Sequence, residues 1–144
     1  MTRSGRCLCG KVQYEIDGDM PNTVNCHCQF CRRAHGAPYV TIAWIPLDRL
    51  RWLAGEEHLR VFGGPAGERA FCSLCGTRMF NRSGDILSLI VATLDEEPER
   101  GPTAHLNLES KSRWHEIRDD LPRHASLPPA IERIIQERGG GLTE

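Results

Sequence analysis

The chain has 144 residues, a formal net charge of −1 and a pI of about 6.6. This length suits one domain with its own hydrophobic core, and the near-neutral charge argues against a general nucleic-acid binder. No apolar run reaches the roughly 18 residues that span a bilayer, and the N-terminus lacks the apolar core of a secretory signal. We therefore expect a cytoplasmic protein with neither nucleic-acid nor membrane partners, and the oligomeric state stays open.

Short runs with two-residue alternation or with many β-branched and aromatic residues recur along the chain and predict strands. In chain order they are Lys11–Ile16, Pro38–Ile45, Leu50–Leu53, His58–Phe62, Glu68–Cys72, residues 77–82, Ile86–Leu94 and Ala104–Glu109. Segments rich in Gly, Pro and Asp separate them. Between the first two runs, Cys31–His35 indicates one helical turn that stops at Gly36.

A longer helix is expected only near the C-terminus, over Pro128–Arg138, because prolines suit a helix start and three isoleucines there share one face. The rest of the pattern predicts one mostly β domain of short antiparallel strands over residues 1–144.

The seven cysteines fall into three tight groups, and their odd number in a reducing compartment favours metal binding over disulfides. The groups are Cys7 with Cys9, Cys26 with Cys28 and Cys31, and Cys72 with Cys75. The first and last groups are each followed at once by glycine, in CLCG and CSLCG. A chain that curls around zinc often needs a positive φ at that place, which glycine adopts without steric cost.

The two glycine-tailed pairs therefore predict one closed tetrahedral zinc site made of Cys7, Cys9, Cys72 and Cys75. Such a site would be structural, since it ties the N-terminal segment to a turn more than sixty residues later. Buried free cysteines are the plainer alternative, but they do not explain the paired spacing.

The remaining triplet, Cys26, Cys28 and Cys31, predicts an exchangeable zinc site of the catalytic type, with three protein ligands and one open position. Thiolates make such a metal soft, so a small-molecule thiol is a natural fourth ligand, and it would bind as the thiolate.

Three alternatives for the triplet stay open at this point. His35 follows Cys31 by four residues, so it faces the same way on a helical turn and could close the site. Ligation by His27 is the second alternative, although a residue between two ligands normally points away from the metal. Cys28 and Cys31 also have the spacing of a reversible disulfide.

The neighbouring Arg32 and Arg33 either offset the thiolate charge and hold a ligand carboxylate, or form a solvated surface pair.

Four segments of the chain together resemble the glutathione-dependent formaldehyde-activating enzyme family, also called the centromere protein V/GFA family. They are GRCLCGKVQYEI, NCHCQFCRRAHGAPYV, FCSLCGTRMF and HLNLESKSRWHEIRDDLPRH, which occur in the family's order from about Gly5 to Pro122. The resemblance implies a zinc-stabilised β-tent fold with a structural site at the two pairs and an exchangeable site at the triplet. It also implies a carbon–sulfur lyase of the S-hydroxymethylglutathione synthase type, with glutathione and an aldehyde as partners.

Two departures from the family pattern stand out. HLNLES lacks the aromatic residue that often follows its histidine, and Arg78 stands where a smaller residue or proline is common. A non-catalytic binding module and a redox or metal-responsive module remain alternative functions for the same fold.

The other polar residues carry less signal, and no catalytic side chain is assigned. His105 and Trp114 belong to the last of the four segments, and a core or lid position is expected for Trp114. Solvated surface is expected for Glu109, Asp119 and Asp120, which have no partner that the sequence identifies.

Overall fold

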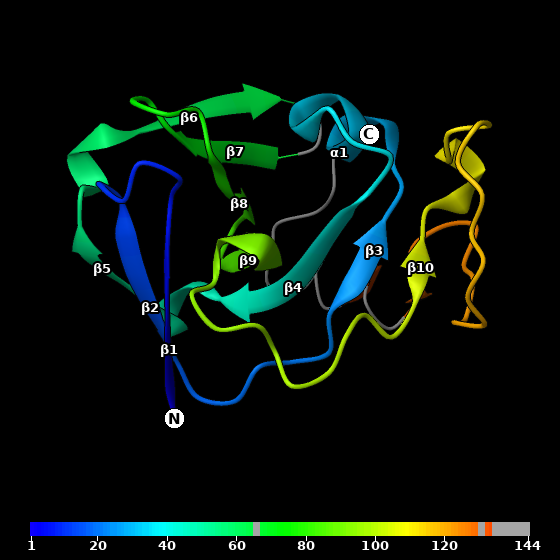
Figure 1. Ribbon diagram of the computed structural model, residues 1–144, viewed down its shortest axis with the longest axis horizontal. Helices are drawn as coiled ribbons and strands as arrows, with labels where there is room; N and C mark the ends of the chain where they lie inside the picture. Colours follow the sequence, from blue (N-terminus) through cyan, green and yellow to red (C-terminus); the bar gives the residue numbers. More distant parts are fainter. Residues whose placement is uncertain (65–66, 130–131, 134–144) are drawn as a thin grey trace.

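The computed structural model describes residues 1–64, 67–129 and 132–133, and within them the chain is mostly β (Figure 1). A three-stranded sheet has the order β1-β2-β5, and a seven-stranded sheet has the order β10-β3-β4-β9-β8-β7-β6. The smaller sheet is formed by β1 (Thr2–Arg6), β2 (Gln13–Asp17) and β5 (Leu50–Ala54). The mostly β prediction is thus confirmed. Within the described residues no helix is both long enough and apolar enough to cross a bilayer.

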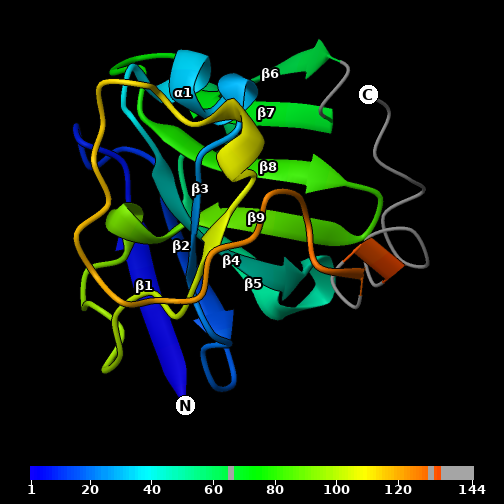
Figure 2. The ribbon, with the colours of Figure 1, turned by 90° about the vertical axis from the view of Figure 1, so that its right-hand side faces the viewer.

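The larger sheet carries the elements that position the candidate site. Its strands are β3 (Val24–Cys26), β4 (Val40–Pro46), β6 (Leu59–Gly64), β7 (Gly67–Cys72), β8 (Arg78–Ser83), β9 (Ile86–Ile90) and β10 (His105–Leu106). The helix α1 (Gln29–His35) follows β3 directly. Both ribbon views place the segment after β10, coloured yellow to orange, on the side of the molecule where β3 and β10 lie (Figures 1 and 2).

Several predicted elements differ from the structure in their bounds. The run expected over Ile86–Leu94 leaves the sheet at Ile90 and continues as a 3₁₀ turn, Val91–Thr93. The run expected over Ala104–Glu109 contains only the two residues of β10, which pairs with β3 in parallel although antiparallel strands were expected. The helical turn before Gly36 is present, and Gly36 ends it with φ of 58°. Most of the helix predicted at Pro128–Arg138 lies outside the described residues.

Strands β4 and β9 are buried on both faces and separate two hydrophobic cores. Alternate residues of β4 point to opposite sides, so Ala43 and Ile45 join one core while Val40 and Ile42 join the other. The first core contains Cys7 and Cys72, and the second contains Cys26 and Cys31; these four cysteines are buried. Each cysteine group is therefore anchored in a core of its own.

Tyr14 of β2 links the smaller sheet to the turn after β9. Its buried hydroxyl donates to Thr93 Oγ1 at 2.7 Å, because the Thr93 hydroxyl itself donates to the Ile90 carbonyl. Gly5 lies against the ring, and a Cβ there would approach the phenol to 2.3 Å, which explains the glycine in this strand. Burial raises the pKa of Tyr14 from its ordinary value of 10.0 to about 12.

We expect Tyr14→Phe to lower the free energy of unfolding by about 1 kcal/mol at pH 8, the typical net value of a hydrogen bond. The folded pKa lies above the unfolded one, so the Tyr14 contribution is complete below pH 10 and is lost as the pH rises toward 12. The gap between wild type and variant in urea unfolding should therefore narrow between pH 8 and pH 11. An unchanged gap would contradict this account.

Candidate metal centres

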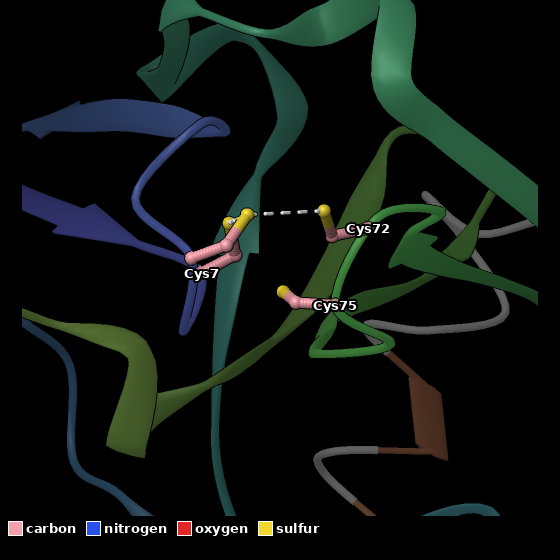
Figure 3. Close-up of side chains that lie close together, drawn as sticks. Cys7, Cys72 and Cys75 are labelled. Atoms are coloured by element: carbon pink, nitrogen blue, oxygen red, sulfur yellow. Dashed lines mark hydrogen bonds between the residues drawn. The ribbon is translucent and has the colours of Figure 1, made fainter.

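The four cysteines of the two glycine-tailed pairs come together, as the sequence predicts. Their sulfur atoms all lie within 4.8 Å of one another. Figure 3 shows the sulfurs of Cys7, Cys72 and Cys75 pointing toward a common centre, with Cys7 on the turn after β1 and Cys75 on the turn between β7 and β8. We call Cys7, Cys9, Cys72 and Cys75 the four-cysteine group.

The two halves of the four-cysteine group are built alike. Gly10 and Gly76 both have positive φ, 77° and 78°, as expected from their place after each pair. Each donates its backbone N–H to the carbonyl of the first cysteine of its pair, Gly10 to Cys7 at 3.0 Å and Gly76 to Cys72 at 2.8 Å. The glycines thus close two turns, the one at Cys72 a residue longer than the one at Cys7, that present sulfur atoms to each other.

Thr77 connects these two turns. Its hydroxyl accepts the backbone N–H of Leu8 at 2.9 Å and lies 3.2 Å from the Cys75 sulfur. Burial tends to raise the pKa of Cys75, but hydrogen bonds from Thr77 outweigh it and lower this pKa to about 5. A thiol that ionises easily is a better metal ligand.

The spacing of the sulfur atoms fits a tetrahedral thiolate site. Metal–sulfur bonds of about 2.3 Å place neighbouring sulfurs of a tetrahedron about 3.8 Å apart. Cys7 and Cys9 are separated by 3.5 Å, and Cys9 and Cys72 by 3.9 Å. These separations are far beyond the roughly 2 Å of a disulfide, and all seven cysteines are free thiols. The donor set therefore fits zinc, and buried hydrophobic thiols alone do not account for the convergence.

The triplet forms a second cluster, which we call the three-cysteine group. The sulfurs of Cys26, Cys28 and Cys31 lie within 4.8 Å of one another, and those of Cys26 and Cys31 are 3.6 Å apart. Cys26 ends β3, Cys28 is the N-cap of α1, and Cys31 lies in the first turn of α1. The Cys28 sulfur accepts the backbone N–H of Cys31 at 3.3 Å, which is the hydrogen bond of an N-cap residue.

Hydrogen bonds within the three-cysteine group give Cys28 a lower pKa than its two neighbours. Hydrogen bonds with Cys26 and then Cys31 lower the pKa of Cys28 to about 2, and the same neighbours raise the pKa of Cys31. Cys28 is therefore the first of the three thiols to ionise. Because metals bind thiolates, this favours cation binding at the group.

Neither candidate histidine joins the three-cysteine group. Among the described residues the group consists of the three cysteines alone, so His35 does not supply the fourth ligand in this structure. Burial, together with the charges of Arg69 and Arg78, lowers the pKa of His35 to about 4. His27 lies away from the sulfurs, as expected, and the centres of the His27 and Tyr39 rings are 5.1 Å apart.

A cavity of about 480 Å³ opens onto the three-cysteine group, and all three cysteines line it. Ile42, Trp44 and Ile86 form an apolar part of its wall. Polar groups come from Arg69, Asn81 and Asn107. A concave, mainly apolar site with a few placed polar groups is typical of small-molecule binding.

Arg69 is the unusual residue in this wall. Its side chain is buried, with 8% of the residue exposed, and it donates to the Oδ1 atom of its cross-strand partner Asn81 at 3.1 Å. No carboxylate forms an ion pair with it among the described residues. A buried guanidinium is costly unless negative charge lies near it, and the thiolates of the three-cysteine group and an anionic ligand would both supply that charge.

Behind the three-cysteine group, three residues form a chain of hydrogen bonds. His105 Nε2 donates to the Asp119 carboxylate at 3.0 Å, and His27 Nε2 donates to His105 Nδ1 at 2.9 Å. This direction follows because His105 uses its proton on Asp119, which leaves Nδ1 as an acceptor. Burial lowers the pKa of His27 to about 4, so His27 is neutral. The chain fixes the backbone between Cys26 and Cys28 from behind.

The structure differs from several other expectations. Asp119 is not plain solvated surface, because it pairs with His105. Trp114 is 77% exposed, so of the two expected positions, core and lid, the structure excludes the core. Arg32 donates to Ser112 Oγ at 3.2 Å and Arg33 is exposed; neither lines the cavity.

Arg78 donates to the Ala34 carbonyl at 3.0 Å and lies over the Phe71 ring, so it braces α1 against β7.

Sequence reasoning missed Arg69, Asn81 and Asn107 as cavity residues. Arg69 carried one weak signal: a charged residue next to Ala70 within the predicted strand Glu68–Cys72. Asn81 and Asn107 carried none, because their roles arise from contacts across strands.

The fold and the two clusters define a mostly β protein with two sulfur-lined centres fit to hold metal ions. A sequence model of the glutathione-dependent formaldehyde-activating enzyme family matches residues 2–110. The chain belongs to this family.

Similar proteins agree with that assignment. A protein of Aspergillus flavus is 26% identical over 113 residues, and one of Phaeosphaeria nodorum is 24% identical over 112; both are provisionally named glutathione-dependent formaldehyde-activating enzymes. Each alignment covers 76% of this chain and 54% of the relative, so the chain spans about half the length of these curated relatives. A crystal structure of a Rhodobacter sphaeroides protein is 29% identical, with a TM-score of 0.55, and the match covers 67% of this chain and 92% of that one.

Proposed function

We propose that the protein is a zinc-dependent enzyme that makes or breaks the carbon–sulfur bond between a thiol, glutathione in the first instance, and an aldehyde. The observation that carries the proposal is the opening of the three-cysteine group into the 480 Å³ cavity. The family's name supports glutathione and formaldehyde as the reagents.

The two cysteine groups would have different tasks. The four-cysteine group would hold a structural ion, because four thiolates that lie within 4.8 Å of one another can fill a tetrahedral shell and would then leave no place for a ligand. The three-cysteine group would hold an exchangeable ion, with the fourth position facing the cavity. Zinc bound there would supply one kind of chemistry, stabilisation of the thiolate form of an incoming thiol.

The chain's own residues would bind and orient the substrate. Arg69 places a fixed positive charge in the cavity wall and would attract an anionic thiol such as glutathione. Ile42, Trp44 and Ile86 would exclude water from the reacting sulfur. The Asp119–His105–His27 chain would keep Cys26 and Cys28 in position.

Zinc analysis and an adduct assay test the proposal together. Mass spectrometric metal analysis should give two zinc ions per chain, and glutathione should change the spectrum of a cobalt-substituted sample. Exchange NMR should show faster interconversion of glutathione and formaldehyde with their S-hydroxymethyl adduct. One ion per chain, with no change in the cobalt spectrum on addition of any small thiol, would contradict the enzyme proposal. Two ions without any rate increase would favour a non-catalytic binding or redox module instead.

We expect Arg69→Met to raise the KM for glutathione about tenfold or more, since a hydrogen bond to a charged group contributes about 1.5–3 kcal/mol. Thermal stability should hold or rise, because an apolar side chain of similar size replaces a buried charge. Arg82→Met is the matched control, as Arg82 also lines the cavity but is exposed, where screening weakens its charge. Equal effects in the two variants would contradict a special role for Arg69.

A further inference from the structure

Asn107 has an unusual backbone conformation next to the three-cysteine group. Its φ and ψ are 57° and 42°, and no other non-glycine residue in the described part of the chain has a positive φ. Left-handed backbone is costly for residues with a side chain, although asparagine tolerates it better than most. Strain of this kind persists where the surrounding structure requires it, and it often marks functional sites.

The usual structural explanation does not apply to this asparagine. Asn107 precedes the 3₁₀ turn Leu108–Ser110 as its N-cap, where asparagine commonly accepts a backbone N–H through its side chain. Here the side chain makes no capping hydrogen bond. Its amide instead donates Nδ2–H to the sulfur of Cys26 at 3.2 Å.

The left-handed conformation is what brings the amide to the sulfur. Leu106 packs in the core that contains Cys26 and Cys31, while His105 on the opposite side of β10 bonds to His27. In a regular strand, residues 105 and 107 would share a face, so Asn107 would point away from Cys26. The backbone turn at Asn107 reverses this direction, and the residue also lines the cavity.

We propose that Asn107 is a positioning residue of the three-cysteine centre, held in a strained conformation so that its amide orients and stabilises the Cys26 thiolate. The segment Cys26–Cys28 is thereby held at two points, by His105 of β10, which bonds to His27, and by Asn107 directly after β10, which bonds to Cys26. The proposal rests on the proposed function, since it assigns Cys26 as a ligand of the exchangeable ion. Partners of metal ligands commonly change metal affinity by about 10- to 100-fold when they are removed.

Two variants separate the amide from the backbone strain. Asn107→Gly removes the amide and relieves the strain, whereas Asn107→Ala removes the amide and keeps a Cβ in the left-handed region. In both, the dissociation constant of the second zinc, measured by competition with a chromophoric chelator, should rise about 10- to 100-fold. Their cobalt derivatives should show the sulfur-to-metal charge-transfer band at lower energy, because the Cys26 sulfur loses a hydrogen bond.

Stability should separate the two variants while metal affinity does not. Stability is compared with one zinc ion per chain, so that only the four-cysteine group is loaded. Relative to the wild type, the urea midpoint should not fall for Asn107→Gly and should fall for Asn107→Ala. The matched control is Asn22→Gly, an exposed asparagine with negative φ, which should lower the midpoint slightly and leave both zinc ions unaffected.

An unchanged second dissociation constant in both variants would overturn the role of Asn107. A weaker second ion accompanied by a lower midpoint in Asn107→Gly would overturn it too, because Asn107 would then be merely structural. If the wild type binds only one ion, the proposed function itself fails, and the inference fails with it. The wild-type stoichiometry therefore distinguishes the two failures.

Discussion

Replacing Cys72 by serine should unfold the protein or lower its melting temperature by roughly 10 °C or more. Cys72 is buried in the first core, and its sulfur lies 3.9 Å from that of Cys9 across a separation of 63 residues. Loss of one thiolate would release the structural ion, and such ions contribute folding free energy directly. A loss of at least about 4 kcal/mol is a large part of the roughly 5–15 kcal/mol that stabilises a domain. Differential scanning calorimetry with metal analysis measures both quantities.

Leu74→Ser provides the control for this experiment. Leu74 occupies the same turn as Cys72 and Cys75 and is exposed, so its replacement changes the turn without removing a ligand. It should change the melting temperature little and leave the zinc content intact. The structural assignment would fail if Cys72→Ser retained its full zinc content and melted with the wild type.

The second large effect is expected from Cys28→Ser, which should lower turnover at least about a hundredfold, equal to about 2.7 kcal/mol. The variant should stay folded, because serine is among the preferred N-cap residues and its hydroxyl can accept the Cys31 N–H that the Cys28 sulfur accepts. Zinc content should fall from two ions to one. Adduct formation followed by NMR, together with metal analysis, tests these outcomes.

Cys28→Ala completes this comparison, because it removes the cap as well as the ligand. It should match Cys28→Ser in activity but be less stable by about 1 kcal/mol, the usual value of an N-cap. Turnover that survives in a folded Cys28→Ser protein with a single zinc ion would exclude the three-cysteine group from the chemistry.

The sequence predicts most strands of the fold but not all of them. β2 and β4 to β9 follow from alternating or β-branched runs, because those residues line a core on at least one face. β1, Thr2–Arg6, has no such run and forms by pairing with β2. β3 is only three residues long, too short for any periodicity, although all three residues are buried.

The sequence likewise predicts only part of the candidate site. Local spacing predicts both cysteine groups, since the glycines after the pairs report a backbone conformation that the structure confirms at Gly10 and Gly76. The contacts of Arg69 and Asp119 depend on residues 12 and 14 positions away, and that of Asn107 on a residue 81 positions away. Such contacts arise only when the strands assemble, and a single sequence carries no direct signal for them.

The separation of the two cores by β4 and β9 has a consequence for how the molecule opens. Cys7 and Cys72 belong to one side of these strands, and Cys26 and Cys31 to the other. Local unfolding events tend to follow such packing units. Hydrogen exchange should therefore show slow amides around the β1–β2 and β7–β8 turns whatever occupies the cavity. The exchange rates of amides in β3, α1 and β10 should change when a ligand binds in the cavity. Ligand binding and release would then leave the packing around the four-cysteine group intact.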